Sequence, residues 1–270
     1  MNPVTADLLK AAPGFASRPQ QDEADYLVFP PDTRRRVTTT NRITDAPYRY
    51  ICQIVIRTGG RTFVGTGTLV GPRTVLTAAH NLFSPLTGRR LRAANLTITP
   101  ARNGGDPPPF GASLARRLIP SPGYDHRRDH NTRRDFAVIQ LRNALGSRAG
   151  WWGQRPRPAF DDLGTSLSAR LPQNPGVLRV NLSGYPVDKG GATQWRSYNR
   201  TIRLRDGLLS YENDTEAGHS GSPVWVRRDR SMGGRVLVGV HIGFDPVTRA
   251  SNRAVAITDD ILRFIATNTV

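Results

Sequence analysis

The stretch Thr215–Trp225 reads T-E-A-G-H-S-G-S-P-V-W and contains a serine between two glycines, closed by a proline. Glycine permits turn conformations that a Cβ forbids, and proline fixes φ and removes a backbone donor. Such a turn presents the Ser220 hydroxyl at its apex and leaves backbone N–H groups facing its surroundings. A serine that transfers acyl groups needs both features. Because a plain Ser/Gly loop explains the motif equally well, a base and an orienting group must come from elsewhere.

Two further segments offer these groups. His80 follows the small residues 77–79, and a neutral imidazole is the usual side chain for moving a proton near pH 7. Asp135 directly precedes the apolar run 136–141, which carries its carboxylate to the edge of the core, within reach of a histidine. Alone, each has a plainer explanation: a histidine in a short helical turn, and an aspartate at a strand end. Together with Ser220 they predict a nucleophile, a base and an orienting acid.

Short β-rich runs must position these side chains. Turn clusters such as 58–60 (T-G-G) and 71–73 (G-P-R) separate the runs, a pattern that predicts an all-β barrel or sandwich. Residues 258–265 predict a helix, because Thr258 is a natural N-cap and two aspartates follow it. The expected strands are 50–56, 61–70, 74–77, 96–99 and 136–141 in the first half, and 178–183, 193–198, 201–204, 207–211, 222–226, 236–242 and 254–257 in the second.

A chain of 270 residues fits one large domain or two modest ones. The β-rich pattern is interrupted at 146–162, a stretch rich in Gly, Pro and Trp that we interpret as the connection between two halves. Residues 1–26 offer little to bury and are expected to form a mobile arm or pro-segment. The predicted division is therefore a unit 27–150, which contains the base and the acid, and a unit 151–270, which contains the nucleophile and the C-terminal helix.

The formal net charge is +17, and only Lys10 and Lys189 of the 38 basic residues are lysines. The arginines lie in small groups along the whole chain, whereas a nucleic-acid binder concentrates them on one element. We therefore expect a solvated arginine-rich surface that attracts acidic partners, and not nucleic acid as the main ligand. No run reaches the ~20 apolar residues of a membrane span, and no secretory signal is visible. These patterns predict no membrane partner. They also predict a location inside the cell, or secretion if the chain is not the full precursor.

Three other reactive side chains are interpreted as structural. Cys52 is the single cysteine, so it has no internal disulfide partner, and its apolar run indicates a small buried hydrophobe. His126 and His130 have the i, i+4 spacing of a helical metal site, but the charges beside them favour a solvated loop. We therefore predict no metal site. No phosphate-binding loop or cofactor motif is present, and no cofactor is expected.

Three motifs, T-A-A-H at His80, D-F-A-V at Asp135 and G-H-S-G-S-P at Ser220, resemble the trypsin/chymotrypsin-like serine peptidases, whose triad has the same order along the chain. The stretch G-Y-P-x-D-K at 184–189 and G-V-H-I-G around His241 make the resemblance closest to the bacterial glutamyl endopeptidases. The resemblance implies two six-stranded Greek-key β-barrels of the chymotrypsin type with a C-terminal helix. It also implies a monomeric serine endopeptidase that cleaves protein or peptide substrates.

The resemblance further implies the role of each residue. Ser220 attacks the scissile carbonyl, His80 removes and returns the proton, and Asp135 orients His80. The backbone N–H groups of Gly218 and Ser220 form the oxyanion hole. His219 stands where the digestive peptidases carry an aspartate that pairs with a newly cut N-terminus, so that activation switch is not expected.

The resemblance also predicts a preference for an acidic residue in the substrate. The residues expected to bind its side chain in the substrate-binding pocket are Thr215, His241 and Gly243. A hydroxyl and an imidazole both donate to a carboxylate. Glu216 and Ile242 depart from the family pattern at this pocket, because Glu216 adds a carboxylate and Ile242 replaces an aromatic residue. Family members also use a free mature N-terminus in this pocket, so cleavage near residue 27 is a further hypothesis. The alternatives are a protease of the same fold with another specificity, acting on one intracellular partner, and a non-catalytic basic binding module.

Overall fold

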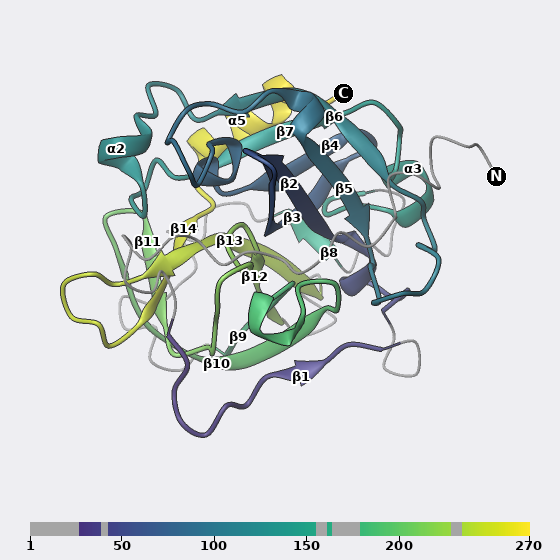
Figure 1. Cartoon of the computed structure of the whole chain (residues 1–270). Helices are drawn as coiled ribbons and strands as arrows, with labels where there is room; N and C mark the ends of the chain where they lie inside the picture. Colours follow the sequence, from purple (N-terminus) through teal and green to yellow (C-terminus); the bar gives the residue numbers. More distant parts are fainter. Residues whose placement is uncertain (1–26, 39–42, 155–160, 164–178, 228–233) are drawn as a thin grey trace.

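The computed structural model describes residues 27–38, 43–154, 161–163, 179–227 and 234–270. Six of its strands form a closed barrel in the order β2-β3-β4-β7-β6-β5 (Figure 1). All neighbouring pairs in this barrel are antiparallel. The strands are β2 (Ile51–Thr58), β3 (Arg61–Gly71), β4 (Thr74–Thr77), β5 (Leu96–Pro100), β6 (Ser113–Pro120) and β7 (Ala137–Leu141).

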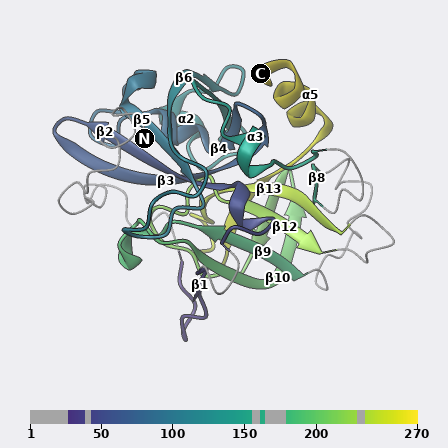
Figure 2. The ribbon, with the colours of Figure 1, turned by 90° about the vertical axis from the view of Figure 1, so that its right-hand side faces the viewer.

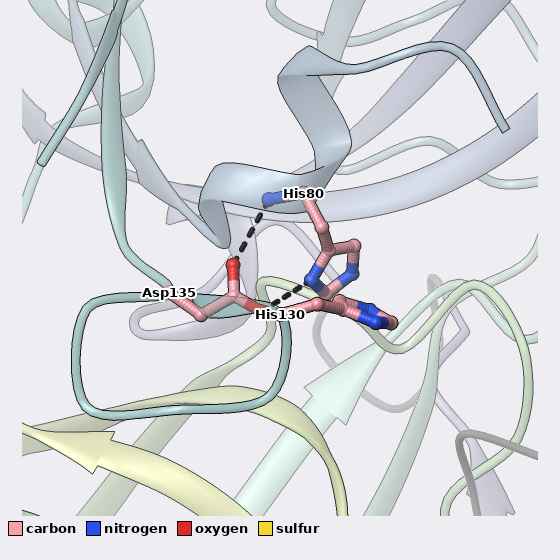
Figure 3. Close-up of side chains that lie close together, drawn as sticks. All are labelled: His80, His130 and Asp135. Carbon is pink, nitrogen blue, oxygen red and sulfur yellow. Dashed lines mark hydrogen bonds and ion pairs between the residues drawn. The ribbon is translucent and has the colours of Figure 1, made fainter. Parts of the chain in front are cut away.

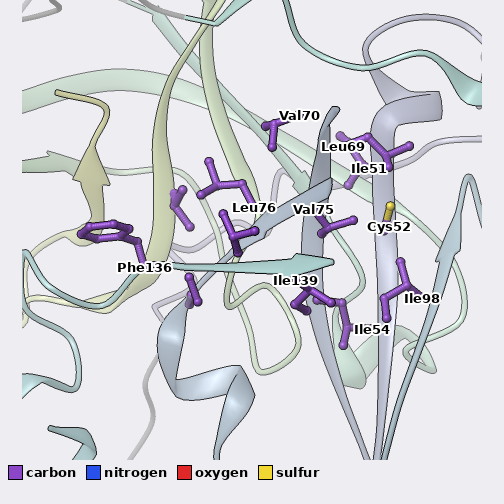
Figure 4. Packing of buried hydrophobic residues seen from close by; sticks show 14 of the residues in the cluster. Ile51, Cys52, Ile54, Leu69, Val70, Val75, Leu76, Ile98, Phe136 and Ile139 are labelled. Atoms are coloured by element: carbon purple, nitrogen blue, oxygen red, sulfur yellow. The ribbon is translucent and has the colours of Figure 1, made fainter. Parts of the chain in front are cut away.

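Aliphatic side chains from these strands fill the first barrel (Figure 4). Ile54, Val75 and Ile139 are completely buried in it, and burying a side chain of this size contributes about 1.5–3 kcal/mol. Cys52 lies in the same core as a free, fully buried thiol, as its apolar surroundings predict. Burial raises the pKa of this thiol, so Cys52 stays protonated and packs as a small apolar side chain.

A second set of strands forms a ring in which β9, β10, β11, β14, β13 and β12 pair in turn and β12 returns to β9. Two short strands extend this ring: β1 (Arg35–Arg36) pairs with β10, and β8 (Asp161–Leu163) runs parallel to β13. The six ring strands are β9 (Arg179–Gly184), β10 (Trp195–Arg205), β11 (Leu208–Tyr211), β12 (Pro223–Arg227), β13 (Arg235–Phe244) and β14 (Asn252–Ala256).

The predicted fold class, two six-stranded barrels with a C-terminal helix, is confirmed. Several details of the strand prediction were wrong, and the short strands β1 and β8 were not expected at all. Strand β6 was missed, because Arg116 and Arg117 are exposed on it and interrupt its apolar pattern. The expected strands 193–198 and 201–204 are one continuous strand, β10. The arm predicted for residues 1–26 lies outside the described residues.

The two ends of the described chain each cross to the other barrel (Figure 2). Helix α5 (Asp259–Asn268) is capped by the Thr258 side chain, which accepts from the Ile261 N–H. It packs on the first barrel, where the ring of Phe264 meets that of Phe136 edge-on, with centroids 5.3 Å apart. At the other end, β1 lies along the second barrel. Both ends of the described chain therefore make contacts across the predicted boundary near residue 150. The division of the chain into two domains stays a prediction.

Short helices occupy the connections between strands. Among the described residues, no helix has the length and apolar character needed to cross a membrane. The 3-10 helices are η1 (Tyr48–Tyr50), η2 (Ala79–Leu82), η3 (Ala93–Asn95) and η4 (Val187–Lys189), and the short α-helices are α2 (His126–Asp129) and α3 (Gly146–Ala149).

Candidate active site

His80 lies in η2, directly after β4 of the first barrel, and its side chain is fully buried. Its Nδ1 is 2.7 Å from Oδ2 of Asp135, and its backbone N–H donates to Oδ1 of the same carboxylate over 2.9 Å (Figure 3). With Nδ1–H donating to the carboxylate, Nε2 carries the lone pair of the neutral ring. The pair therefore presents a proton acceptor whose tautomer is set by Asp135.

Asp135 precedes β7, and its carboxylate is also fully buried. The backbone N–H of Asn131 donates to its Oδ2 over 2.9 Å, in addition to the two bonds from His80. Three donors on one carboxylate hold it in a single orientation, which in turn holds the imidazole.

Ser220 is half-buried in the turn that leads into β12. The turn needs glycine on both sides of it. Gly218 has φ +94°, and a Cβ there would lie 2.2 Å from the Tyr185 carbonyl oxygen. Gly221 has φ +87°, and a Cβ there would lie 2.0 Å from the Thr66 carbonyl oxygen. These two glycines therefore let the turn pack directly against backbone.

Residues of the first barrel hold this turn of the second. The Ser220 carbonyl accepts from the Thr66 N–H and from Nδ2 of Asn81, both over 2.8 Å. Asn81 is the residue after His80, so this bond ties the serine to the helical turn of the histidine. The Gly218 carbonyl accepts from Oγ1 of Thr66 over 2.7 Å. Asn81 and Thr66 were not predicted as site residues, because nothing in the sequence pairs them with residues 139 and 152 positions away.

The Gly218 and Ser220 N–H groups donate no hydrogen bond to any part of the chain that the structure describes. The Ala217 carbonyl accepts from the Val187 N–H over 2.7 Å, and the His219 carbonyl accepts from the Ser222 N–H over 2.8 Å, which fixes the planes of the two peptides that carry these donors. Backbone donors that are fixed but unused are what an oxyanion hole requires.

The predicted substrate-binding residues lie on both sides of the Ser220 turn. The backbone of His241 on β13 pairs with the turn itself, accepting from the Gly221 N–H over 2.7 Å and donating to the Ser222 carbonyl over 2.8 Å. Thr215 is fully buried, and its Oγ1 has no hydrogen-bond partner among the described residues. Gly243 has φ +148° at a β-bulge after His241. A buried hydroxyl without a partner is uncommon, and it suits a position that awaits a ligand.

Burial, and next to it the charge of His80, lowers the pKa of His241 to about 3. Its Nδ1 lies 2.7 Å from the hydroxyl of Tyr211, which also reaches the Arg253 carbonyl over 3.1 Å. His241 is therefore a neutral imidazole, oriented by a buried tyrosine that was not predicted from the sequence.

Glu216 and His219 are both engaged within the loop before Ser220. Oε1 of Glu216 accepts from the neighbouring Ala217 N–H over 2.9 Å. Nδ1 of His219 accepts from the Glu216 N–H over 3.0 Å. His219 is fully buried, and burial, followed by the charge of His241, holds its pKa well below the usual range. A neutral histidine therefore occupies the position directly before Ser220. The Glu216 carboxylate, three residues earlier, is bonded to a backbone N–H of the same loop.

The segment that begins at Leu27 holds the other end of this loop. The Leu27 carbonyl accepts from the Thr215 N–H over 2.9 Å. The buried carboxylate of Asp214 accepts from the backbone N–H groups of Phe29 and Thr33, each over 2.8 Å. Asp214, which was not predicted from the sequence, thus anchors this segment beside the pocket.

Arg34 extends the same anchor. It was expected on the solvated surface, but its side chain is only 2% exposed. The guanidinium makes paired hydrogen bonds to Asp32 and to Asp188, which lies in η4 next to the loop. These bonds hold the pKa of Asp32 well below its usual range. The motif G-Y-P-x-D-K drew attention to Asp188, but its partner was not evident from the sequence.

His130 was interpreted as part of a solvated loop, and this was wrong. It directly follows α2 and is half-buried, with its ring edge-on to that of His80 and the ring centroids 4.7 Å apart. His126, by contrast, stacks on Phe83 with the rings parallel. The i, i+4 pair is therefore split between two different contacts.

Comparisons with known proteins identify the family of this chain. A family model described as Trypsin matches residues 39–262. A glutamyl endopeptidase of Bacillus licheniformis is 32% identical over 232 residues, which cover 85% of this chain and 65% of that protein. An extracellular metalloprotease of Bacillus subtilis is 32% identical over 213 residues, covering 78% of this chain and 60% of that protein. The chain therefore spans less than two thirds of the length of both relatives.

A solved structure titled as a Glu endopeptidase in complex with MPD superimposes with a TM-score of 0.68 at 24% identity, covering 89% of this chain and 98% of that one. At this identity the superposition supports the fold alone. The family match carries the classification, since it extends over most of the residues, and it shows that this chain belongs to the trypsin family of serine peptidases.

Proposed function

We propose that this chain is a serine endopeptidase that hydrolyses peptide bonds through an acyl-enzyme. The observation that carries the proposal is the buried 2.7 Å hydrogen bond between His80 Nδ1 and Asp135 Oδ2, next to a serine turn that Asn81 ties to the same 3-10 helix. Membership of the trypsin family supports it.

In this proposal Nε2 of His80 takes the hydroxyl proton as Oγ of Ser220 bonds to the scissile carbonyl carbon. The carbonyl oxygen becomes an oxyanion that accepts from the Gly218 and Ser220 N–H groups, each such donor being worth ~3 kcal/mol. Asp135 stabilises the imidazolium. His80 then protonates the leaving amine, and a water molecule, deprotonated by His80, hydrolyses the ester and releases Ser220.

We further propose that the enzyme prefers an acidic residue, glutamate above all, before the scissile bond. The buried Oγ1 of Thr215 without a partner supports this preference, and so does the ring of His241, whose Nε2 can donate to a carboxylate once the ring takes up a proton. The engagement of Glu216 with the Ala217 N–H also supports it, because that carboxylate is directed to its own loop. The names of glutamyl endopeptidase relatives point the same way.

The name of the Bacillus subtilis relative raises metal-dependent hydrolysis as a second possibility, and the donor set around His80 argues against it. A catalytic zinc site uses three protein ligands and an open position. Among the described residues, the metal-capable group here is His80, His130 and Asp135. The Asp135 carboxylate already accepts three hydrogen bonds, which leaves two imidazoles.

The test is to incubate the wild-type chain and Ser220→Ala with a mixed peptide library and to identify the cut sites by mass spectrometry. The experiment is repeated after removal of residues 1–26, to reveal any latency. We expect cutting after Glu and Asp in the wild type and none in Ser220→Ala. No Ser220-dependent cutting in either form overturns the enzyme proposal and favours a binding module. Cutting after other residues rejects only the acidic preference.

A further inference from the structure

The ring of His130 meets the ring of His80 edge-on, at an interplanar angle of 82° (Figure 3). One metal-capable atom from each of His80, His130 and Asp135 can be chosen so that all three lie within 4.8 Å of one another. His130 is half-buried and belongs to the loop between α2 and β7.

The geometry decides which atoms can take a metal ion. Tetrahedral zinc with bonds of about 2.0–2.1 Å to nitrogen keeps its ligand atoms roughly 3.3 Å apart. His80 Nδ1 and Asp135 Oδ2 are 2.7 Å apart, so no ion fits between them. The ligand atom of His80 is therefore Nε2. Asp135 then acts behind it, since a carboxylate that accepts the other ring N–H orients a metal-bound histidine and raises its basicity.

The donor set also selects the ion. Two imidazoles suit zinc and other late transition metals, whereas magnesium and calcium require oxygen ligands. The two remaining tetrahedral positions are left to water.

We propose that His80 and His130 form an inhibitory zinc site. Zinc on Nε2 of His80 occupies the lone pair that the proposed mechanism uses to take the serine proton, so metal binding and hydrolysis exclude one another. The inhibitory consequence rests on the proposed function, whereas the binding of the metal does not.

His126 provides a matched control on the same loop. Its ring centroid is 5.7 Å from that of His130, but it stacks on Phe83, and its Nδ1 faces the Tyr124 hydroxyl over 3.4 Å. It is not part of the three-residue group. Replacing either histidine with phenylalanine keeps an aromatic ring of similar size and removes its ligand nitrogens.

Binding is measured by isothermal titration of zinc chloride into the full chain with Ser220→Ala, which needs no activity. We expect one zinc ion per chain. His130→Phe is expected to weaken its affinity by at least about tenfold, within the range for loss of a group that supports a metal. His80→Gln is expected to weaken it at least as much, and His126→Phe by less than about threefold. Thermal unfolding of each variant checks that it is folded. Unchanged affinity in His130→Phe, or an equal loss in His126→Phe, overturns the site.

Inhibition is measured on the active chain with a peptide substrate, as the ratio of rates with and without zinc chloride. Zinc is expected to inhibit, EDTA to restore the rate, and magnesium chloride to have no effect. Each rate is divided by the metal-free rate of the same variant. The zinc concentration that gives half inhibition should be at least tenfold higher in His130→Phe than in the wild type. Full activity at saturating zinc overturns the inhibitory role. If zinc binds as expected but no Ser220-dependent hydrolysis exists, the proposed function fails and the metal site stands.

Discussion

The Tyr211 hydroxyl lies 2.7 Å from Nδ1 of His241, and both side chains are buried beneath the proposed substrate pocket. The hydroxyl has one proton, and the Arg253 carbonyl 3.1 Å away can only accept it. When Tyr211 donates to Arg253, its oxygen accepts from Nδ1–H of His241. Nε2 of a neutral His241 then has no proton to donate, so binding a carboxylate there requires uptake of a proton. A bound carboxylate favours that uptake by raising the low pKa of His241.

Tyr211→Phe is therefore expected to reduce the preference for glutamate. The substitution removes the acceptor that stabilises the charged imidazole, and a hydrogen bond to a charged group contributes about 1.5–3 kcal/mol. We expect the ratio of kcat/KM for matched Glu and Gln peptides to fall roughly tenfold or more. Tyr198→Phe, on the exposed face of β10, is the control and should leave the ratio unchanged. An unaltered ratio in Tyr211→Phe would show that His241 binds the substrate without this support.

Asp135→Asn tests the orienting role directly. An amide in this position donates to Nδ1 and places the ring proton on Nε2, where it blocks proton transfer. Loss of kcat by about 10⁴-fold is the general consequence for a triad. KM should change little, because Asp135 lies behind His80 and is fully buried. Steady-state kinetics of a variant with a wild-type circular dichroism spectrum would measure this, and a loss below tenfold would remove Asp135 from the mechanism.

Arg34→Met tests whether the segment at residues 32–34 holds the loop of the pocket. The substitution removes the guanidinium that bonds both Asp32 and Asp188 and leaves Lys189, whose Nζ is 3.3 Å and 3.7 Å from them, as their shared cation. Breaking a buried pair costs 3–5 kcal/mol, and we expect about 2–3 kcal/mol because the two carboxylates are 30% and 33% exposed. The free energy of unfolding in urea measures the loss. The neighbouring exposed Arg35→Met is the matched control, and equal losses in the two variants would refute the anchor.

Local context was enough to predict the candidate catalytic residues. His80, Asp135 and Ser220 each stand at the junction of an apolar run with small or turn-forming residues, and the structure pairs His80 with Asp135. The strands were visible for the same reason, because alternation and turn clusters are local signals. Strand β6 was hidden where Arg116 and Arg117 occupy its exposed face.

What the sequence did not reveal depends on pairs that only the folded chain brings together. Arginine is usually a surface residue. Arg34 is buried because its guanidinium pairs with Asp188, which is 154 positions away. Asn81 reaches the Ser220 carbonyl across 139 positions. The charges beside His126 and His130 indicated a solvated loop, whereas the loop before Asp135 turns His130 toward His80. Long-range hydrogen bonds and ring contacts of this kind leave no periodic pattern in the chain.

The buried neutral histidine before the nucleophile predicts loss of stability in acid. The pKa of His219 is lowered in the folded chain because the ring is buried, whereas the unfolded value is about 6.5. Below pH 6.5 the unfolded chain therefore binds a proton that the folded chain does not. The stabilising contribution is complete above that pH and is lost as pH falls, by up to about 1.4 kcal/mol per pH unit for each such group.

We expect the free energy of unfolding in urea to decrease from pH 7 to pH 5. His219→Gln should reduce that slope, even if its stability at pH 7 is lower, because one proton fewer is taken up. An unchanged slope in His219→Gln would mean that other groups cause the loss of stability in acid.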